Sequence, residues 1–332
     1  MTALRERARV FDTQRPQSFF LERERAESGE IVSVATVFLT NRECPWRCVY
    51  CDLWKGTTTE TVPVGAIPAQ IDFALNELAR APEQRTALSA DGVKPAGTAD
   101  MPVRRSASQI KLYNAGSFFD PRAIPPEDFP AIAERLHGFE RVIVECHPAL
   151  VGDSAVRFRD LLTTTTKLEV AVGLEIADDA ILAKLNKRMT LAMFRRAAEF
   201  LRECHIAMRA FVMVKPPFVR SEDEALDFAQ RSIDFAFDCD ATAVSLIPAR
   251  FGPEPLQTLA ASGDFAPPAL ATLEAALDYG VAQQRGRVFA DVWDSEKFSD
   301  CAKCFSARRE RLVQINLQQK LLPKVKCQPA CV

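Results

Sequence analysis

Three cysteines stand within eight residues of one another, in the segment Cys44-Pro-Trp-Arg-Cys48-Val-Tyr-Cys51. The segment follows an apolar run at residues 31–39, which alternates at first and then becomes continuously apolar. This pattern predicts a strand buried in a parallel sheet, with the cysteines on the loop that leaves its carboxyl end. Three thiolates on one loop can hold three corners of an iron–sulfur cluster, which normally takes four cysteine ligands. The fourth iron would then be open to a small molecule.

Zinc and disulfides are the alternatives for these thiols. A structural zinc site uses cysteine or histidine ligands in pairs, whereas this loop holds three cysteines and the chain has only three histidines. A disulfide knot is untypical of a chain of this length whose amino terminus lacks the apolar core of a secretory signal. We therefore expect the ten cysteines to be reduced in a cytoplasmic protein, and the loop favours a cluster over zinc or unliganded thiols.

Strand and helix patterns alternate along most of the chain. Strand patterns cover residues 31–40, 110–113, 141–145, 167–175, 207–214 and 241–247, and helical periodicity covers 63–78, 125–136, 154–162, 178–185, 191–204 and 221–237. This alternation predicts an α/β fold built from parallel βαβ units. An open doubly wound sheet and a full or partial barrel both fit, and both place their chemistry at the carboxyl ends of the strands.

The length of 332 residues suits one large α/β domain with an appendage. We expect residues 1–30 to form an irregular or partly helical lead-in, residues 31–250 the core, and residues 251–332 a C-terminal extension. Residues 81–107 are polar and show no period, which predicts a long surface insertion. No apolar run is long enough to span a bilayer, so no membrane contact is expected.

The spacing Cys-x3-Cys-x2-Cys, with the aromatic Tyr50 before the last cysteine, resembles the signature of the radical S-adenosylmethionine (radical SAM) enzymes. The resemblance implies a partial (β/α)6 barrel and a [4Fe-4S] cluster on Cys44, Cys48 and Cys51. It also implies that the open iron chelates the methionine end of S-adenosylmethionine, and that Tyr50 lies against the adenine. One electron, from a donor such as flavodoxin or ferredoxin, would cleave the sulfonium to a 5′-deoxyadenosyl radical.

Residues at other strand ends are candidates for contacts with S-adenosylmethionine. A carboxylate at the end of a buried strand is costly without a partner, and ribose hydroxyls or a methionine ammonium would serve; a salt bridge to a neighbouring basic residue is the alternative. Where radical SAM enzymes have a Gly-Gly-Glu-Pro-like segment this chain lacks the acid, so backbone or the Ser117 hydroxyl would make that contact. The candidates are Asn114, Ala115, Gly116 and Ser117, then Glu145 and Glu175, then Lys187, Arg188 and Lys215.

Several stretches together are similar to a narrower group, the radical SAM subunit of archaeosine synthase and its bacterial relatives, and more distantly to elongator-type radical SAM proteins. These stretches are residues 113–120, 172–175, 185–187 and 214–218. The resemblance implies hydrogen abstraction from a modified tRNA nucleoside. A small metabolite, lipid or peptide substrate is the first alternative, and a non-catalytic metal-binding module is the second.

Four cysteines near the carboxyl terminus form a second constellation. Cys301 and Cys304 make one close pair, and Cys327 and Cys331 make another after a predicted helix at residues 306–319. Two close pairs at this separation predict a site of four thiolates. Zinc and an auxiliary iron–sulfur cluster use the same ligands, and both remain open here.

Overall fold

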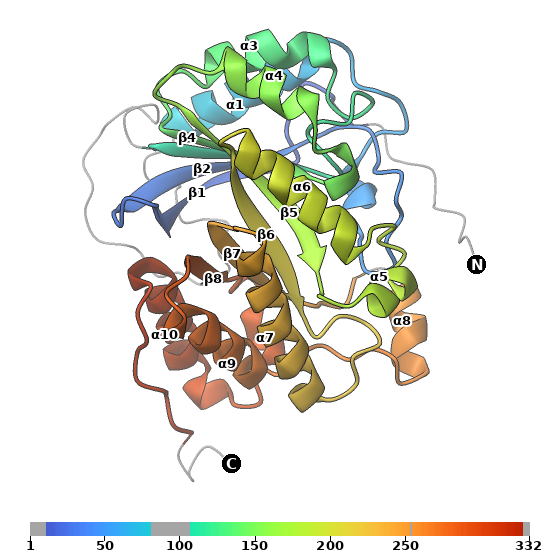
Figure 1. Cartoon of the computed structure of the whole chain (residues 1–332), viewed down its shortest axis with the longest axis vertical. Coiled ribbons are helices and arrows are strands. Elements are labelled where there is room, and N and C mark those ends of the chain that lie inside the picture. The colour runs from blue at the N-terminus through green and yellow to red at the C-terminus, as the bar shows by residue number, and fades with distance from the viewer. Residues whose placement is uncertain (1–10, 81–106, 253, 328–332) are drawn as a thin grey trace. The chain divides into compact units, whose positions relative to one another are not determined.

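The computed structural model describes residues 11–80, 107–252 and 254–327 (Figure 1). The chain divides into two compact units. The first unit comprises Met1–Glu24, Ile31–Pro45 and Leu53–Val170, and the second comprises Arg25–Glu30, Trp46–Asp52 and Ala171–Val332. The cysteine loop crosses the division, because Cys44 belongs to the first unit while Cys48 and Cys51 belong to the second.

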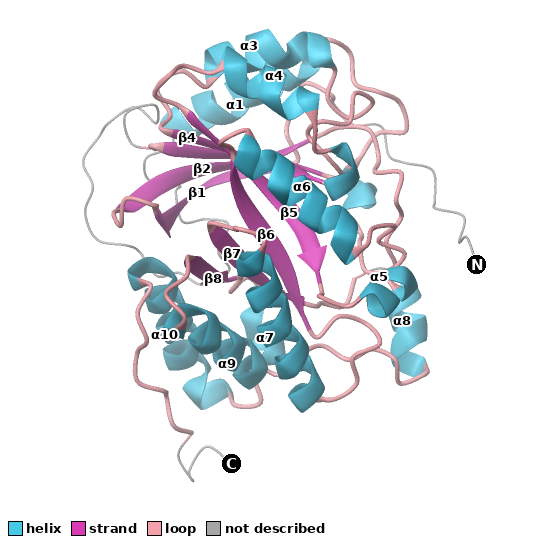
Figure 2. Ribbon diagram, viewed as in Figure 1, coloured by secondary structure: helices cyan, strands magenta, loops and turns pink. Residues whose placement is uncertain are grey.

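The first unit pairs its strands in chain order. Its strands are β1 (Ser18–Arg25), β2 (Ile31–Leu39), β3 (Gln109–Asn114), β4 (Arg141–Cys146) and the start of β5 (Lys167–Glu175); its helices are α1 (Ala66–Arg80), α3 (Phe129–Arg135) and α4 (Asp153–Leu161), with short 3-10 helices at Leu53–Gly56, Pro126–Asp128 and Pro148–Leu150. β2 pairs with β3 and β3 with β4 in parallel. Helices α1, α3 and α4 lie side by side in this unit (Figure 2).

The second unit continues from the end of β5. It contains β6 (Ala207–Val214), β7 (Ala243–Pro248) and β8 (Arg287–Ala290), with α5 (Asp179–Lys184), α6 (Leu191–Glu203), α7 (Glu222–Asp238), α8 (Glu254–Ala261), α9 (Leu270–Ala282), α10 (Ala302–Gln318) and a 3-10 helix at Ser295–Phe298. β6 pairs with β7 and β7 with β8 in parallel. The predicted α/β fold is confirmed, and its six expected strands follow one another in the order of a partial (β/α)6 barrel.

Polar caps set the starts of three helices in the second unit. The side chain of Asp178 accepts a hydrogen bond from a backbone N–H in the first turn of α5, Thr190 does the same for α6, and Ser221 for α7. Such caps satisfy backbone donors that have no partner inside the helix. They fix where α5 begins after β5, where α6 begins after α5, and where α7 begins after β6.

The prediction for residues 1–30 was wrong over Ser18–Arg25, which form the strand β1 rather than an irregular or helical segment. The charged residues of this stretch conceal the strand from a hydrophobic pattern. Glu22 and Glu24 point to the same face and both bind the ammonium of Lys111 in β3, at 2.9 and 2.5 Å. Lys111 and Glu24 are each 7% exposed, so Glu24 is a buried partner, while Glu22 reaches the same ammonium from a side chain that is 37% exposed.

Three elements were not anticipated from the sequence, namely α8, α9 and β8, all within residues 251–332. β8 stands at the end of the strand order, where an outer strand leaves backbone groups unpaired. Two amide side chains, one in α10 and one at the residue that caps its end, bind these groups. Asn316 exchanges hydrogen bonds with the backbone N–H and C=O of Ala290, and Gln319 does the same with Val288.

The expected surface insertion at residues 81–107 lies outside the described residues, except for its last position. Among the helices that the structure describes, none is long and apolar enough to cross a membrane.

Candidate functional site

The cysteine loop in the second unit is tied to the connection between α5 and α6. The backbone N–H of Cys51 donates to the carbonyl of Cys48 at 3.2 Å, which closes a tight turn around Tyr50. Val49 N–H donates to the carbonyl of Leu185 at 3.1 Å. The Asn186 amide donates to two earlier loop carbonyls, at 2.9 and 3.0 Å. The loop that carries Cys48 and Cys51 is therefore held by the Leu185 carbonyl and the Asn186 side chain, both of which follow α5.

Glu175 and Lys187 form a buried ion pair beside this loop. Lys187 Nζ lies 2.6 Å from Glu175 Oε1, and the two side chains are only 10% and 9% exposed. Gly173 makes room for the pair, since a Cβ there would lie 2.5 Å from Lys187 Nζ and 2.6 Å from Glu175 Oε1. Glu175 itself has a φ of 65°, a strained value for a residue with a side chain. The carboxyl end of β5 is thus shaped to hold one pair of charges.

Charge and burial couple this pair to the loop. Burial, and then the Glu175 carboxylate, raise the pKa of Tyr50 well above its ordinary value, and the phenol hydrogen-bonds to Glu175. Burial also raises the pKa of Cys48, although the Lys187 ammonium opposes the shift. Burial works against the charged form of Lys187, but Glu175 and then Cys48 outweigh it and leave the lysine pKa raised. Tyr50 is consequently a proton donor, and Lys187 a buried cation facing Cys48.

The ring of Tyr50 has a defined apolar seat. It packs against a buried cluster in which Met213 is next to the last residue of β6, Ala249 follows β7, and Leu256 comes from α8. The sequence predicts that this ring contacts adenine, and that role stays a prediction. The observed packing fixes the ring, while the hydroxyl is aimed at Glu175.

Cys44 lies against the segment that follows β3 in the first unit. Gly116 has a φ of 136°, and a Cβ there would lie 3.3 Å from Cys44 Cβ and 3.8 Å from its sulfur. The carbonyl of the preceding Ala115 accepts a hydrogen bond from the Asn41 amide at 3.4 Å. A glycine is needed at position 116 for both its backbone conformation and the close approach of Cys44.

The end of β4 supports the same segment. Glu145 accepts a hydrogen bond from the backbone N–H of Asn114 on its carboxylate at 2.6 Å and one from Phe118 on its carbonyl at 2.8 Å. The Ser117 hydroxyl accepts from the backbone N–H of His147 at 2.8 Å. Glu145 and Ser117 therefore fix the turn at residues 114–118, and the His147 ring caps the 3-10 helix at Pro148–Leu150.

Asn114 has an amide without a hydrogen-bond partner. Its side chain is 2% exposed, and neither its oxygen nor its nitrogen finds a partner among the described residues. It lines a cavity of about 40 Å³, together with Ala115, Glu145 and the carboxyl end of β2. A buried amide normally has its hydrogen bonds satisfied. The unsatisfied amide on a cavity wall therefore indicates a polar ligand or ordered water at this place.

The remaining two candidates have partners elsewhere. Lys215, buried at the end of β6, forms an ion pair with Glu222 at the start of α7. Glu222 also accepts hydrogen bonds from Thr272 and from the backbone N–H of Ala269, which joins this pair to α9. Arg188 is exposed, and its guanidinium donates to the Asn186 side chain at 3.3 Å. Contacts of Lys215 and Arg188 with a cofactor stay predictions.

Each unit thus assembles part of the predicted set. The second unit joins Cys48, Tyr50, Cys51, Glu175 and Lys187, and the first joins Cys44, Asn114, Ala115, Gly116, Ser117 and Glu145. Sequence reasoning missed Asn186 and Gly173. An asparagine directly after a helix and a glycine two residues before a strand-end acid were the available signals, but neither names its contact.

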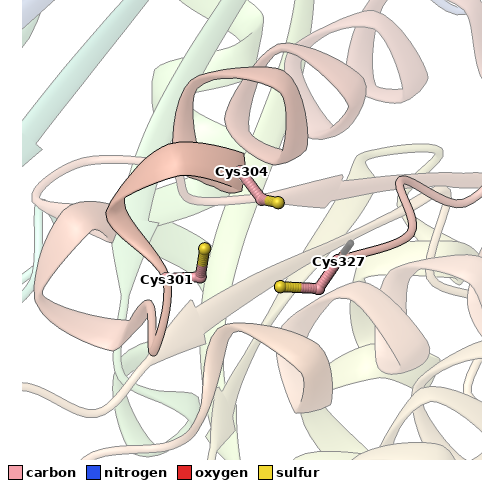
Figure 3. Close-up of side chains that lie close together, drawn as sticks. All are labelled: Cys301, Cys304 and Cys327. Atoms are coloured by element: carbon pink, nitrogen blue, oxygen red, sulfur yellow. The ribbon is translucent and has the colours of Figure 1, made fainter. Parts of the chain in front are cut away.

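The carboxyl-terminal cysteines also converge (Figure 3). The sulfurs of Cys301, Cys304 and Cys327 all lie within 4.8 Å of one another. Cys331, the predicted fourth ligand, lies outside the described residues.

Comparison with known proteins finds relatives that are similar in sequence. No family model matches the chain. Archaeosine synthase subunit beta of Methanosarcina acetivorans is 25% identical over 250 residues, which cover 73% of this chain and 65% of the relative. The protein of the same name from Thermococcus kodakarensis is 30% identical over 129 residues, covering 37% and 39%. The expected resemblance to archaeosine synthase is therefore confirmed, and the chain spans less than two thirds of the length of these relatives.

Among solved structures, the archaeal Elp3 of Methanocaldococcus infernus superposes with a TM-score of 0.42 at 15% identity, over 55% of this chain and 47% of that one. A score of this size indicates a partial structural likeness only.

Proposed function

We propose that this chain is a radical SAM enzyme whose [4Fe-4S] cluster is held by Cys44, Cys48 and Cys51 and binds S-adenosylmethionine. The observation that carries the proposal is the Cys48–Cys51 turn, hydrogen-bonded to the residues after α5 and electrostatically coupled to Glu175 and Lys187. The sequence similarity to archaeosine synthase subunit beta supports it. A one-electron donor such as flavodoxin or ferredoxin would serve it.

The residues present fit these groups on two structural grounds. Cys44 is packed against Gly116, where a Cβ would lie 3.8 Å from the sulfur, so the segment that carries the other predicted contacts approaches this thiol closely. The buried amide of Asn114 has hydrogen bonds to offer, at a cavity next to the predicted cofactor contacts Ala115 and Glu145. A thiolate loop and an unsatisfied amide are the features that a cluster and a polar cofactor require.

The chain's own residues would position the cysteine loop and neutralise the charge of its thiolates. When bound, the cluster and S-adenosylmethionine supply a 5′-deoxyadenosyl radical by one-electron reductive cleavage, which abstracts a substrate hydrogen. Lys187 places a positive charge beside the thiolate of Cys48 and so offsets the cost of burying it. Glu175 fixes both the Lys187 ammonium and the Tyr50 phenol, which holds the turn between Cys48 and Cys51 in one geometry.

For the substrate, we propose a modified tRNA nucleoside. The support is the name of the relatives, archaeosine synthase. Binding of tRNA would weaken steeply with added salt because phosphate contacts release counterions. Binding that is absent, or that is insensitive to salt, would favour the alternative class of small metabolites, lipids or peptides.

The radical SAM assignment is tested by replacing Cys48. Anaerobically purified and reconstituted Cys48→Ala should form no 5′-deoxyadenosine from S-adenosylmethionine under a strong reductant, whereas the wild-type chain should form it. Cys204→Ala is the matched control, because Cys204 is a half-buried cysteine outside both thiol clusters, and it should keep wild-type turnover. Equal turnover by Cys48→Ala and the wild-type chain would overturn the assignment. A wild-type chain that binds neither iron nor S-adenosylmethionine would instead support the non-catalytic metal-binding module.

A further inference from the structure

We propose that Cys301, Cys304 and Cys327 bind one zinc ion, which fastens the segment after α10 to the start of that helix. The three side chains lie close together and come from three different backbone positions (Figure 3), and their sulfurs all lie within 4.8 Å of one another. Cys301 precedes α10, Cys304 is in its first turn, and Cys327 comes from the segment that follows the helix. This site is separate from the cysteine loop at residues 44–51, and the proposal does not depend on the proposed function.

The fold brings Cys327 back to the start of the helix by a defined route. Gln319 ends α10 with a φ of 51°, and its side chain is anchored on Val288 of β8. The guanidinium of Arg311, in the middle of α10, then donates to the carbonyls of Leu322 and Pro323 at 2.8 to 3.1 Å. The segment therefore returns along the helix, and Cys327 reaches its first turn.

The segment after α10 has no regular structure of its own. Residues 321–327 form no helix or strand, and the Arg311 hydrogen bonds hold the segment at Leu322 and Pro323. Arg311 is itself fixed by Asp278 of α9, at 2.7 and 2.9 Å. A metal on Cys327 would hold the far end of the segment, so that it is fastened at Gln319, at Arg311 and at the thiols.

The surroundings of the thiols suit anionic ligands around a cation. Cys301 and Cys304 are each 8% exposed, and buried thiolates are costly unless a cation compensates them. Both stand at the amino end of a 17-residue helix, where the backbone dipole favours negative charge. Thiolates are ligands that zinc prefers in structural sites.

The sulfur spacing distinguishes a single ion from an auxiliary cluster, the two alternatives that the sequence leaves open. Ligands that share one tetrahedral zinc, with bonds of about 2.3 Å, have sulfurs about 3.8 Å apart. In a [4Fe-4S] cluster each cysteine binds a different iron, and in a [2Fe-2S] cluster each iron takes only two cysteines. In either cluster at least one pair among three cysteines therefore binds different irons, and the sulfurs of that pair must stand farther apart than about 3.8 Å. Sulfurs that all lie within 4.8 Å are near the spacing for one ion, and we therefore assign zinc.

The experiment measures metal in the full chain. Protein purified from medium that contains both zinc and iron should carry about one zinc per chain at this site. The variant with Cys44, Cys48 and Cys51 all changed to alanine should retain that zinc. Cys327→Ser should weaken zinc binding by about 100-fold or more in competition with a chromophoric chelator. Cys204→Ser, a control thiol outside the cluster, should leave the zinc affinity unchanged. Cys327 is exposed, so this substitution removes little packing.

A second measurement separates a ligand from a residue that only affects folding. Cobalt(II) added to the zinc-free chain should give the intense visible absorption of a tetrahedral thiolate site, and this absorption should be lost in Cys327→Ser while the far-ultraviolet circular dichroism stays unchanged. Zinc removal should also speed amide exchange over residues 319–327. Unchanged zinc affinity in Cys327→Ser, no cobalt absorption in the wild-type chain, or iron and sulfide in place of zinc at these thiols would each overturn the proposal.

Discussion

Replacing Lys187 by methionine removes one partner of the buried ion pair and leaves the Glu175 carboxylate facing the Tyr50 hydroxyl alone. Because both side chains of the pair are about one tenth exposed, solvent screens the lost interaction little. Removal of one partner of a buried pair costs about 3–5 kcal/mol. We expect a loss of this size in the apparent free energy of unfolding, measured by urea denaturation at pH 7.

The double variant Lys187→Met with Glu175→Gln tests the physical reason. It removes the unpaired charge, so it should recover part of the stability that the single variant loses, with a coupling energy of about 1 kcal/mol or more. Lys320→Met, at an exposed lysine, is the control and should change stability by no more than about 0.5 kcal/mol. A Lys187→Met variant as stable as this control would refute the reasoning that the pair is buried and mutually required.

Gly116→Ala should lower the free energy of unfolding, measured in urea, more than Gly138→Ala does. Both positions have positive φ, so alanine costs about 1–2 kcal/mol in left-handed strain at either one, but only a Cβ at position 116 also meets Cys44. Equal losses would contradict the close approach. Burial acts to raise the pKa of Glu222, but hydrogen bonds from Lys215, Thr272 and Ala269 outweigh it and leave the pKa below 4.5. Its stabilising contribution is therefore present above pH 4.5 and lost as the pH falls through the lowered value, so Glu222→Gln should flatten the acid limb of the stability profile, and superimposable limbs would argue against the linkage. Cys331→Ser should lower zinc affinity in the chelator competition if the predicted four-thiolate set is correct, and an unchanged affinity would remove Cys331 from it.

Much of the fold was readable because its strands are buried on both faces. The runs at β2, β5 and β6 are mostly apolar and mostly buried, and such runs separated by helical periods leave few alternatives to parallel βαβ units. The sequence pattern did not predict β1, because its charged residues Glu22 and Glu24 bind Lys111, a partner 87 residues or more along the chain. β8 has only four residues, too few to show a period.

The candidate site was predictable in its residue types and not in its pairings. The sequence predicts that Glu175 ends a strand and that Lys187 follows the next helix, and it leaves a salt bridge open as an alternative to cofactor contact. It gives no sign that the two pair with each other over Gly173, or that Lys215 pairs with Glu222. These choices depend on distances across the fold, which the local pattern does not contain.

The most direct test of the central claim is the electron paramagnetic resonance spectrum of the reduced, anaerobically reconstituted chain, recorded with and without S-adenosylmethionine. A cluster held by Cys44, Cys48 and Cys51, with one iron open, should give a [4Fe-4S]⁺ signal whose g values shift when S-adenosylmethionine binds. A chain that gives no such signal, or a signal that S-adenosylmethionine leaves unchanged, would contradict the claim.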